Sequence, residues 1–142
     1  MLTRLFSWSI ALASIAVAPT AMAEDGYDLW LRYPRAEGTA LSTLSSHATS
    51  IAMTARGETA KKAGEELIRG LGAMTGRAPA LTATPQAGSI WLATPSTDPT
   101  LASQSVKLDG LGDEGYLIRT VTVNGNPVTL IAANQEIGLL YG

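Results

Sequence analysis

The sequence has no cysteine, only one histidine and few aromatic residues. Without cysteine no disulfide can brace the fold, so stability must come from packing. A zinc site is strongly disfavoured, because Cys and His are the usual protein ligands of structural zinc. The formal net charge is only −2, which gives no electrostatic reason for the chain to bind nucleic acid or an anionic membrane.

The chain does have an N-terminal segment, residues 1–23, that is typical of a secretory signal peptide. Arg4 supplies the positive end, residues 5–17 form an apolar core broken only by three serines, and Ala21-Met22-Ala23 is a small-x-small cleavage site. A retained membrane anchor is the alternative, but the apolar run is shorter than the roughly 20 residues that a spanning helix needs. The sequence therefore predicts export to the periplasm or the medium. It also predicts one mature domain over residues 24–142, with no membrane contact after cleavage.

Short apolar stretches predict three separate strands. Residues 28–33 alternate imperfectly between apolar and polar side chains and stop at Pro34, which cannot donate to a sheet ladder. Residues 49–54 and 89–94 are the other two stretches. The small, polar residues 35–47 are expected to form a loop.

The clearest helix is predicted over residues 59–71. Its apolar positions recur at spacings of three and four, with charged residues on the other face. The glycines at positions 70, 72 and 76 suit its end. A second, short helix is predicted over residues 100–106. The expected buried positions of the long helix are Ala60, Ala63, Leu67 and Leu71.

The C-terminal third predicts a hairpin and then a helix. Two β-branched-rich runs, residues 116–123 and 128–133, are separated by an Asn-Gly pair, which is a strong hairpin signal. Asn134 is expected to be the N-cap of the last helix, with Glu136 in its first turn. Its expected buried face consists of Ile137, Leu140 and Tyr141. Because so short a helix is unstable by itself, we expect the domain to be truncated inside this element.

The interleaved strands and helices, with one antiparallel hairpin, indicate the fold class. We expect an α/β (α+β) fold, a two-layer sandwich in which a mixed sheet of about five strands has helices packed on one face.

Two features that could suggest chemistry are more simply structural. His47 is expected to be a surface or loop histidine without a special role. The glycines between positions 70 and 76 superficially suggest a dinucleotide loop. However, their last spacing is one residue too long for that motif, and they follow a helix where the motif needs a strand.

Glycoside hydrolysis uses pairs of carboxylates, but no such pair is evident in this sequence. Glu65 and Glu66 lie on the polar side of the predicted helix and point in different directions. The other acids are expected to be solvated residues in turns or at element ends. They are Glu24, Asp25, Asp28, Asp109, Asp113, Glu114 and Glu136. We therefore predict no catalytic, cofactor-binding or metal-binding residue in this chain, and no cofactor.

The few aromatic residues also have structural interpretations. Trp30 and Trp91 lie among aliphatic residues in predicted strands and are expected in the core, although exposed aromatic rings would be able to stack on sugars. Tyr27 and Tyr33 flank the first predicted strand and could lie at an interface with another domain.

Four segments carry a resemblance to a known family. They are residues 24–33 (EDGYDLWLRY), 66–71 (ELIRGL), 112–118 (GDEGYLI) and 131–142 (IAANQEIGLLYG). In this order they resemble the N-terminal domain of the α-glucuronidases of glycoside hydrolase family 67. The first and last segments are the most specific, and the resemblance is loose between residues 79 and 101.

The resemblance implies a small α/β domain that precedes a (β/α)₈ catalytic barrel. Such enzymes remove 4-O-methyl-glucuronic acid from xylo-oligosaccharides with inversion, and their catalytic carboxylates lie in the barrel. The chain is therefore expected to be a non-catalytic accessory domain, inactive by itself, whose partner is the barrel. Xylo-oligosaccharide would be a partner only through the full enzyme. The alternative is a stand-alone exported module that binds carbohydrate or protein, which would need an exposed aromatic platform.

Overall fold

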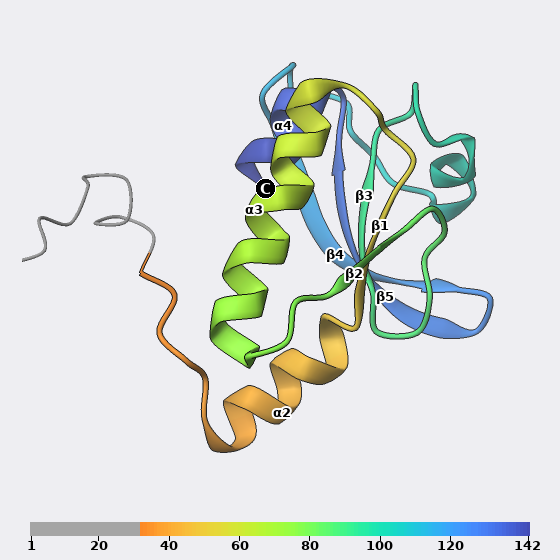
Figure 1. Ribbon diagram of the computed structural model, residues 1–142. Coiled ribbons are helices and arrows are strands. Elements are labelled where there is room, and N and C mark those ends of the chain that lie inside the picture. The colour runs from red at the N-terminus through yellow and green to blue at the C-terminus, as the bar shows by residue number, and fades with distance from the viewer. Residues whose placement is uncertain (1–31) are drawn as a thin grey trace, which may run out of the picture. The chain divides into compact units, whose positions relative to one another are not determined.

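The structure, a computed structural model, describes residues 32–142 (Figure 1). These residues all belong to one compact unit, Leu31–Gly142. The predicted signal peptide and most of the strand predicted at residues 28–33 lie outside the described residues. Arg32 and Tyr33, the last two residues of that predicted strand, are described and lie in an irregular segment. The strand prediction is therefore wrong at this end.

A mixed sheet of five strands forms the centre of the fold. Its strand order is β2-β1-β3-β5-β4. β1 runs parallel to both β2 and β3, β3 runs parallel to β5, and β4 and β5 form the antiparallel hairpin. The strands are β1 (Ser50–Met53), β2 (Ala80–Thr82), β3 (Ile90–Ala93), β4 (Tyr116–Val123) and β5 (Asn126–Ala133). This confirms the predicted fold class.

The inner strands β1 and β3 were predicted, at residues 49–54 and 89–94. All four residues of each are buried, as expected for parallel strands covered on both faces. The edge strand β2 was not predicted. It has only three residues between Pro79 and Pro85 and shows no alternation of burial. The hairpin was predicted correctly, because the Asn124-Gly125 turn is a local signal and both residues have the positive φ that such a turn requires.

Within the described part of the chain, three α-helices accompany the sheet, namely α2 (Gly38–His47), α3 (Glu58–Thr75) and α4 (Glu136–Tyr141). Figure 1 shows α3 and α4 side by side on one side of the sheet. α2 corrects the prediction of a loop over residues 35–47. None of its residues is buried, and only the half-buried Leu44 packs against the core. A helix with so little contact to the core needs no apolar periodicity, which is why the sequence did not predict it. None of the helices in residues 32–142 is long and apolar enough to cross a membrane.

The long helix α3 continues beyond its predicted end. Gly70 and Gly72 lie within the helix, and Gly76 terminates it in a left-handed conformation, with its N–H donated to the carbonyl of Gly72. Gly70 ends nothing. The ring of Tyr33 lies so close that a Cβ at this position would be 2.9 Å from a ring carbon. The predicted burial of Ala60, Ala63 and Leu71 is confirmed, whereas Leu67 is half-buried.

The sheet separates two hydrophobic cores. On one side, Ile51, Leu92 and Ile131 pack against α3 and α4. On the other side, Trp91, Val128 and Leu130 are covered by the connection from β3 to β4, which contains the 3₁₀-helix η1 (Pro99–Gln104). The short helix predicted at residues 100–106 is therefore present as a 3₁₀ turn, and the α-helices pack on one face as predicted.

The last helix differs from its prediction in two respects. Gln135, not Asn134, is the N-cap of α4. The Asn134 amide instead donates to the carbonyls of Leu108 and Gly112, at 3.1 and 2.9 Å, and so ties a distant turn to the end of β5. The buried face of α4 consists of Gly138 and Leu139, whereas Ile137 and Leu140 are half-buried and Tyr141 is 53% exposed.

Candidate functional site

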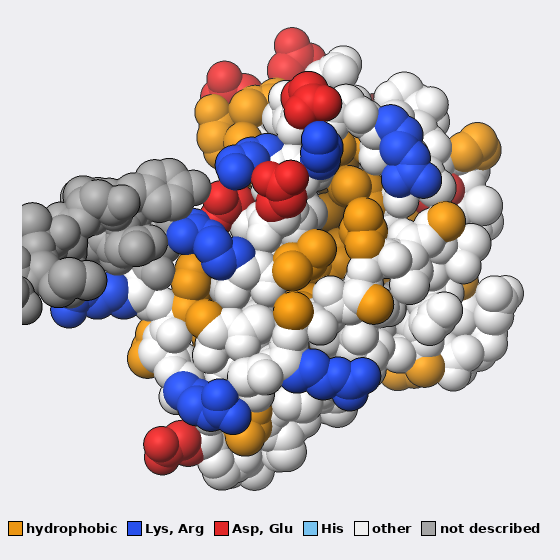
Figure 2. Space-filling view, in the orientation of Figure 1, with side chains coloured by type: hydrophobic (Ala, Val, Ile, Leu, Met, Phe, Trp, Pro, Cys, Tyr) orange, Lys and Arg blue, Asp and Glu red, His pale blue; other side chains and the backbone are white. Residues whose placement is uncertain are grey.

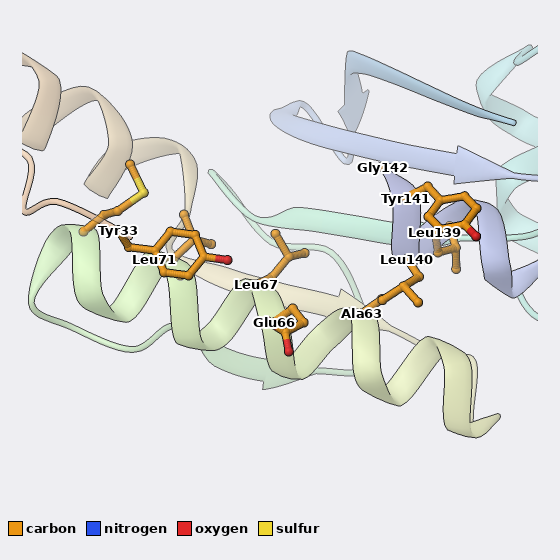
Figure 3. A pocket seen from close by; sticks show the side chains of 11 residues that line it. Tyr33, Ala63, Glu66, Leu67, Leu71, Leu139, Leu140, Tyr141 and Gly142 are labelled. Atoms are coloured by element: carbon orange, nitrogen blue, oxygen red, sulfur yellow. The ribbon is translucent and has the colours of Figure 1, made fainter. Parts of the chain in front are cut away.

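A groove of about 290 Å³ runs between α3 and α4 (Figure 3). In Figure 3, Tyr33 lies at one end and the α4 residues at the other, with Leu67 between them. Both helices contribute apolar side chains to its walls. The lining residues are Tyr33, Ala63, Glu66, Leu67, Gly70, Leu71, Met74, Leu139, Leu140, Tyr141 and Gly142.

Charged side chains form one rim of this groove. Glu66 pairs with Arg69, whose Nε lies 3.2 Å from Glu66 Oε2, and Lys62 Nζ lies 3.9 Å from Glu66 Oε1. The Arg69 guanidinium also lies over the Tyr33 ring, 5.7 Å from its centroid. The predicted polar face of the helix is thus present, but Glu66 is only partly solvated and its side chain is 25% exposed.

Beside the groove, part of the sheet is not covered by any helix of residues 32–142. β4 is an edge strand, and the register that pairs Ile118 with Ile131 places both side chains on the helical face. However, α4 has only six residues, and Tyr116, Ile118 and Tyr141 remain 43%, 49% and 53% exposed. We call these three residues, together with the half-buried Leu140, the open apolar face. Figure 2 shows the molecule from the side of α3, where hydrophobic side chains lie beside charged ones.

The opposite face of the sheet carries a polar cleft of about 520 Å³. Its walls are the loop after β2, the 3₁₀-helix η1 and the β4–β5 turn. Trp91 and Asp98 lie at its base and are only 1% and 4% exposed. The other lining residues are mainly hydroxyl and amide side chains, namely Thr54, Thr84, Thr100, Ser103, Gln104, Thr122 and Asn124.

Asp98 accepts hydrogen bonds from Trp91 and Thr100. Its Oδ2 accepts a hydrogen bond of 2.9 Å from the Trp91 indole N–H. Its Oδ1 accepts from the Thr100 backbone N–H and hydroxyl, at 3.1 and 2.6 Å. The carboxylate therefore caps η1 and anchors the largest buried side chain of this face. Asp98 was not among the predicted functional residues, although Asp-Pro at positions 98 and 99 is a local signal for a helix start.

Among residues 32–142, the sequence-predicted candidates do not come together in one cluster. His47 is exposed as predicted, but it ends α2 rather than lying in a loop, with Nδ1 2.9 Å from the Thr43 carbonyl. Asp109, Asp113 and Glu114 are exposed turn residues, as predicted. Glu24, Asp25, Asp28, Tyr27 and Trp30 lie outside the described residues. Within residues 32–142, no group of three or more His, Asp or Glu side chains could hold a metal ion.

Glu136 has a role that the sequence did not reveal. It lies in the first turn of α4, as predicted. Its carboxylate also reaches the start of α3, where it accepts hydrogen bonds from the backbone N–H groups of Gly57 and Ala60, each at 3.3 Å. Glu136 thus caps a helix that begins 78 residues earlier in the chain.

The model of the N-terminus of glycosyl hydrolase family 67 matches residues 29–142. The chain belongs to this family. Its resemblance to the N-terminal domain is therefore confirmed, and the matched residues contain none of the catalytic barrel. No curated protein matches the sequence significantly. As a family 67 N-terminal domain, the chain is associated with a glycosidase. Its buried Trp91 leaves no aromatic stacking platform at that position for the stand-alone module considered above.

Proposed function

We propose that this chain is the non-catalytic accessory domain of a xylan-degrading α-glucuronidase. The observation that carries the proposal is the family match over residues 29–142. The family resemblance implies that the carboxylates which hydrolyse the 4-O-methyl-glucuronic acid bond lie in the barrel. In this proposal the domain contributes stability and positioning to the enzyme, and no chemical step.

The partner in this proposal is the (β/α)₈ barrel, and the contact is the open apolar face with the adjoining groove. Ile118 and Tyr141 expose about half of their area in an otherwise packed layer, and burying such side chains in an interface is favourable. The Glu66–Arg69 pair on the groove rim would lie at the polar edge of that interface.

Binding to a barrel tests the partner directly. The chain is mixed with the barrel region of a family 67 enzyme prepared without its own N-terminal domain, and the complex is measured by calorimetry. The variant Ile118→Thr with Tyr141→Ser is expected to weaken the complex by at least tenfold. Leu81→Ser is the matched control, because Leu81 is also 50% exposed but lies on the other edge strand. Equal weakening by both variants would contradict the proposed interface.

The absence of chemistry in the domain has its own test. The purified chain is incubated with aldouronic acids, and the release of 4-O-methyl-glucuronic acid is followed. We expect no release by the chain alone. Turnover that persists after repurification would show that the domain itself is catalytic, and the proposal would fail.

We also propose that the chain is exported through the signal peptide at residues 1–23. The supporting observation is the cleavage site Ala21-Met22-Ala23 after an apolar core. Mass spectrometry of the exported chain is expected to find a new N-terminus at Glu24. In the variant Ala23→Arg this cleavage is expected to be lost, and a fully retained cytoplasmic chain in the wild type would contradict the proposal.

A further inference from the structure

The polar cleft on the face opposite α3 is distinct from the interface proposed for the barrel. It lies between three chain segments that are distant in sequence, and its base is the Trp91–Asp98 pair. Its volume of about 520 Å³ falls within the range of about 300–1,000 Å³ that small-molecule sites occupy.

The charges of the cleft limit the kind of ligand that it can hold. None of the residues that line it is Lys, Arg or His, and the only charged side chain is Asp98. An anionic ligand would therefore meet a buried carboxylate without a compensating cation. The remaining polar side chains are neutral hydroxyls and amides, which favour a neutral ligand rich in hydroxyl groups.

The cleft also has unused hydrogen-bonding capacity. A carboxylate can accept about four hydrogen bonds, and Asp98 accepts three short ones from Trp91 and Thr100. The Thr54 hydroxyl is 3.5 Å from Asp98 Oδ2 but donates to the Thr97 carbonyl at 2.9 Å. Within the described residues, the Asn124 side-chain amide has no hydrogen-bond partner.

We propose that this cleft binds a neutral oligosaccharide, with one sugar hydroxyl donating to Asp98 Oδ2. The amides of Gln104 and Asn124 then bind further hydroxyls from the two side walls. Because Trp91 is buried and offers no face for stacking, the affinity rests on hydrogen bonds and is in the millimolar range. Such a site would hold the domain close to a polysaccharide chain without any catalytic step.

The test uses the indole N–H of Trp91 as a reporter. The ¹⁵N-labelled 142-residue chain is titrated with xylotetraose and with cellotetraose, while the Trp91 indole and the side-chain amides of Gln104 and Asn124 are followed by NMR. Saturable shifts of these signals are expected with at least one of the two sugars. The choice of a xylose chain rests on the proposed function, but binding of either sugar supports the cleft. No saturable shift with either sugar would overturn it.

Two variants and one acidic ligand make the test specific. The double variant Gln104→Leu with Asn124→Gly is expected to raise the dissociation constant about tenfold, and its spectrum reports whether the fold is retained. Glycine is chosen at position 124 because the residue there has a positive φ. Ser42→Ala on α2 is the control and should leave the constant unchanged. Tetragalacturonic acid is expected to bind at least several-fold more weakly than the neutral sugar. Unchanged binding in the double variant, or tighter binding of the acidic sugar, would overturn the proposal. Release of glucuronic acid is not measured, so failure here is distinguishable from failure of the proposed function.

Discussion

Asp98 is the polar residue on which the packing of Trp91 depends most directly. Its carboxylate is buried and holds both the Trp91 indole and the first turn of η1. Removing the carboxylate would leave a buried N–H without a partner, which costs more than the loss of an exposed hydrogen bond. The Trp91 indole therefore depends on this one acidic side chain for its hydrogen bond.

Replacement of Asp98 by Ala tests this dependence. We expect the variant to lower the free energy of unfolding by about 2–3 kcal/mol, since charged hydrogen bonds contribute about 1.5–3 kcal/mol. Urea unfolding followed by circular dichroism measures the change. Asp109→Ala, at an exposed turn residue, is the control and should change stability by less than about 0.5 kcal/mol. Similar values for the two variants would show that the buried carboxylate is not needed for stability.

Glu136 links two helices that are distant in the sequence, α4 and α3. It supplies the cap that α3 lacks, because the N-cap residue Gly57 has no side chain to accept from the first turn. The carboxylate also lies at the N-terminal end of α3, where negative charge is favourable. A Cβ at Gly57 would collide with Glu136 Oε2, so the absence of a side chain at position 57 makes this contact possible.

The capping role predicts coupling between positions 57 and 136. We expect Glu136→Ala to cost about 1 kcal/mol of stability, whereas Glu114→Ala, in an exposed turn, should cost much less. Gly57→Ala should be more destabilising in the wild type than in the Glu136→Ala background, because the collision then disappears. A double-mutant cycle measured by urea unfolding gives the coupling. Strict additivity of the two changes would argue against the cap.

Two glycines within α3 have different reasons to be there. Glycine in a helix costs about 1 kcal/mol relative to alanine. At Gly72 an added Cβ would lie 3.4 Å from Ala78, an ordinary contact, whereas at Gly70 it would lie 2.9 Å from the Tyr33 ring. The close approach of Tyr33 to the helix therefore explains Gly70 but not Gly72.

This difference predicts opposite outcomes for the same substitution. Gly72→Ala is expected to raise the free energy of unfolding by about 0.5–1 kcal/mol, and Gly70→Ala is expected to give no gain. In a Tyr33→Ala background, Gly70→Ala should become stabilising by a similar amount. Thermal or urea unfolding of the four variants decides the matter. If Gly70→Ala stabilises the wild type as much as Gly72→Ala does, Tyr33 is not packed on α3.

The elements that the sequence predicted well are those with local signals. The hairpin was evident from Asn124-Gly125, and α3 from its apolar spacing. The strand β2 was not evident, because three residues form a strand there only through pairing with β1. Likewise, Gly70 was predicted to suit the helix end, although the helix continues past it. The reason for a glycine there is the close approach of Tyr33, a tertiary contact that the local sequence does not show. Asp98 had a local signal in the following proline, but its bond to Trp91 depends on the fold.

The open apolar face is a property of the whole molecule, and no single segment predicts it. Tyr116 and Ile118 are two residues apart on β4, so both side chains lie on the same face of the sheet. They are exposed because α3 covers the central strands and α4 is short. Tyr141 was predicted to be buried but is exposed. Helical spacing indicates which face of a helix is apolar, but it does not show how much of that face a neighbouring layer covers. The exposed apolar area therefore arises from the arrangement of the elements.

This exposed area predicts how the isolated chain behaves in solution. At high concentration we expect reversible self-association through the open apolar face, because contiguous exposed apolar side chains next to an edge strand favour it. Sedimentation velocity over a concentration series measures it. The variant Ile118→Thr with Tyr141→Ser should remain monomeric at concentrations where the wild type associates. Leu81→Ser, on the opposite edge strand, should associate like the wild type. A chain that is monomeric at all concentrations, or loss of association in Leu81→Ser, would show that the exposed side chains on β4 and α4 do not mediate self-association. Either result would also count against these side chains as the interface with the barrel.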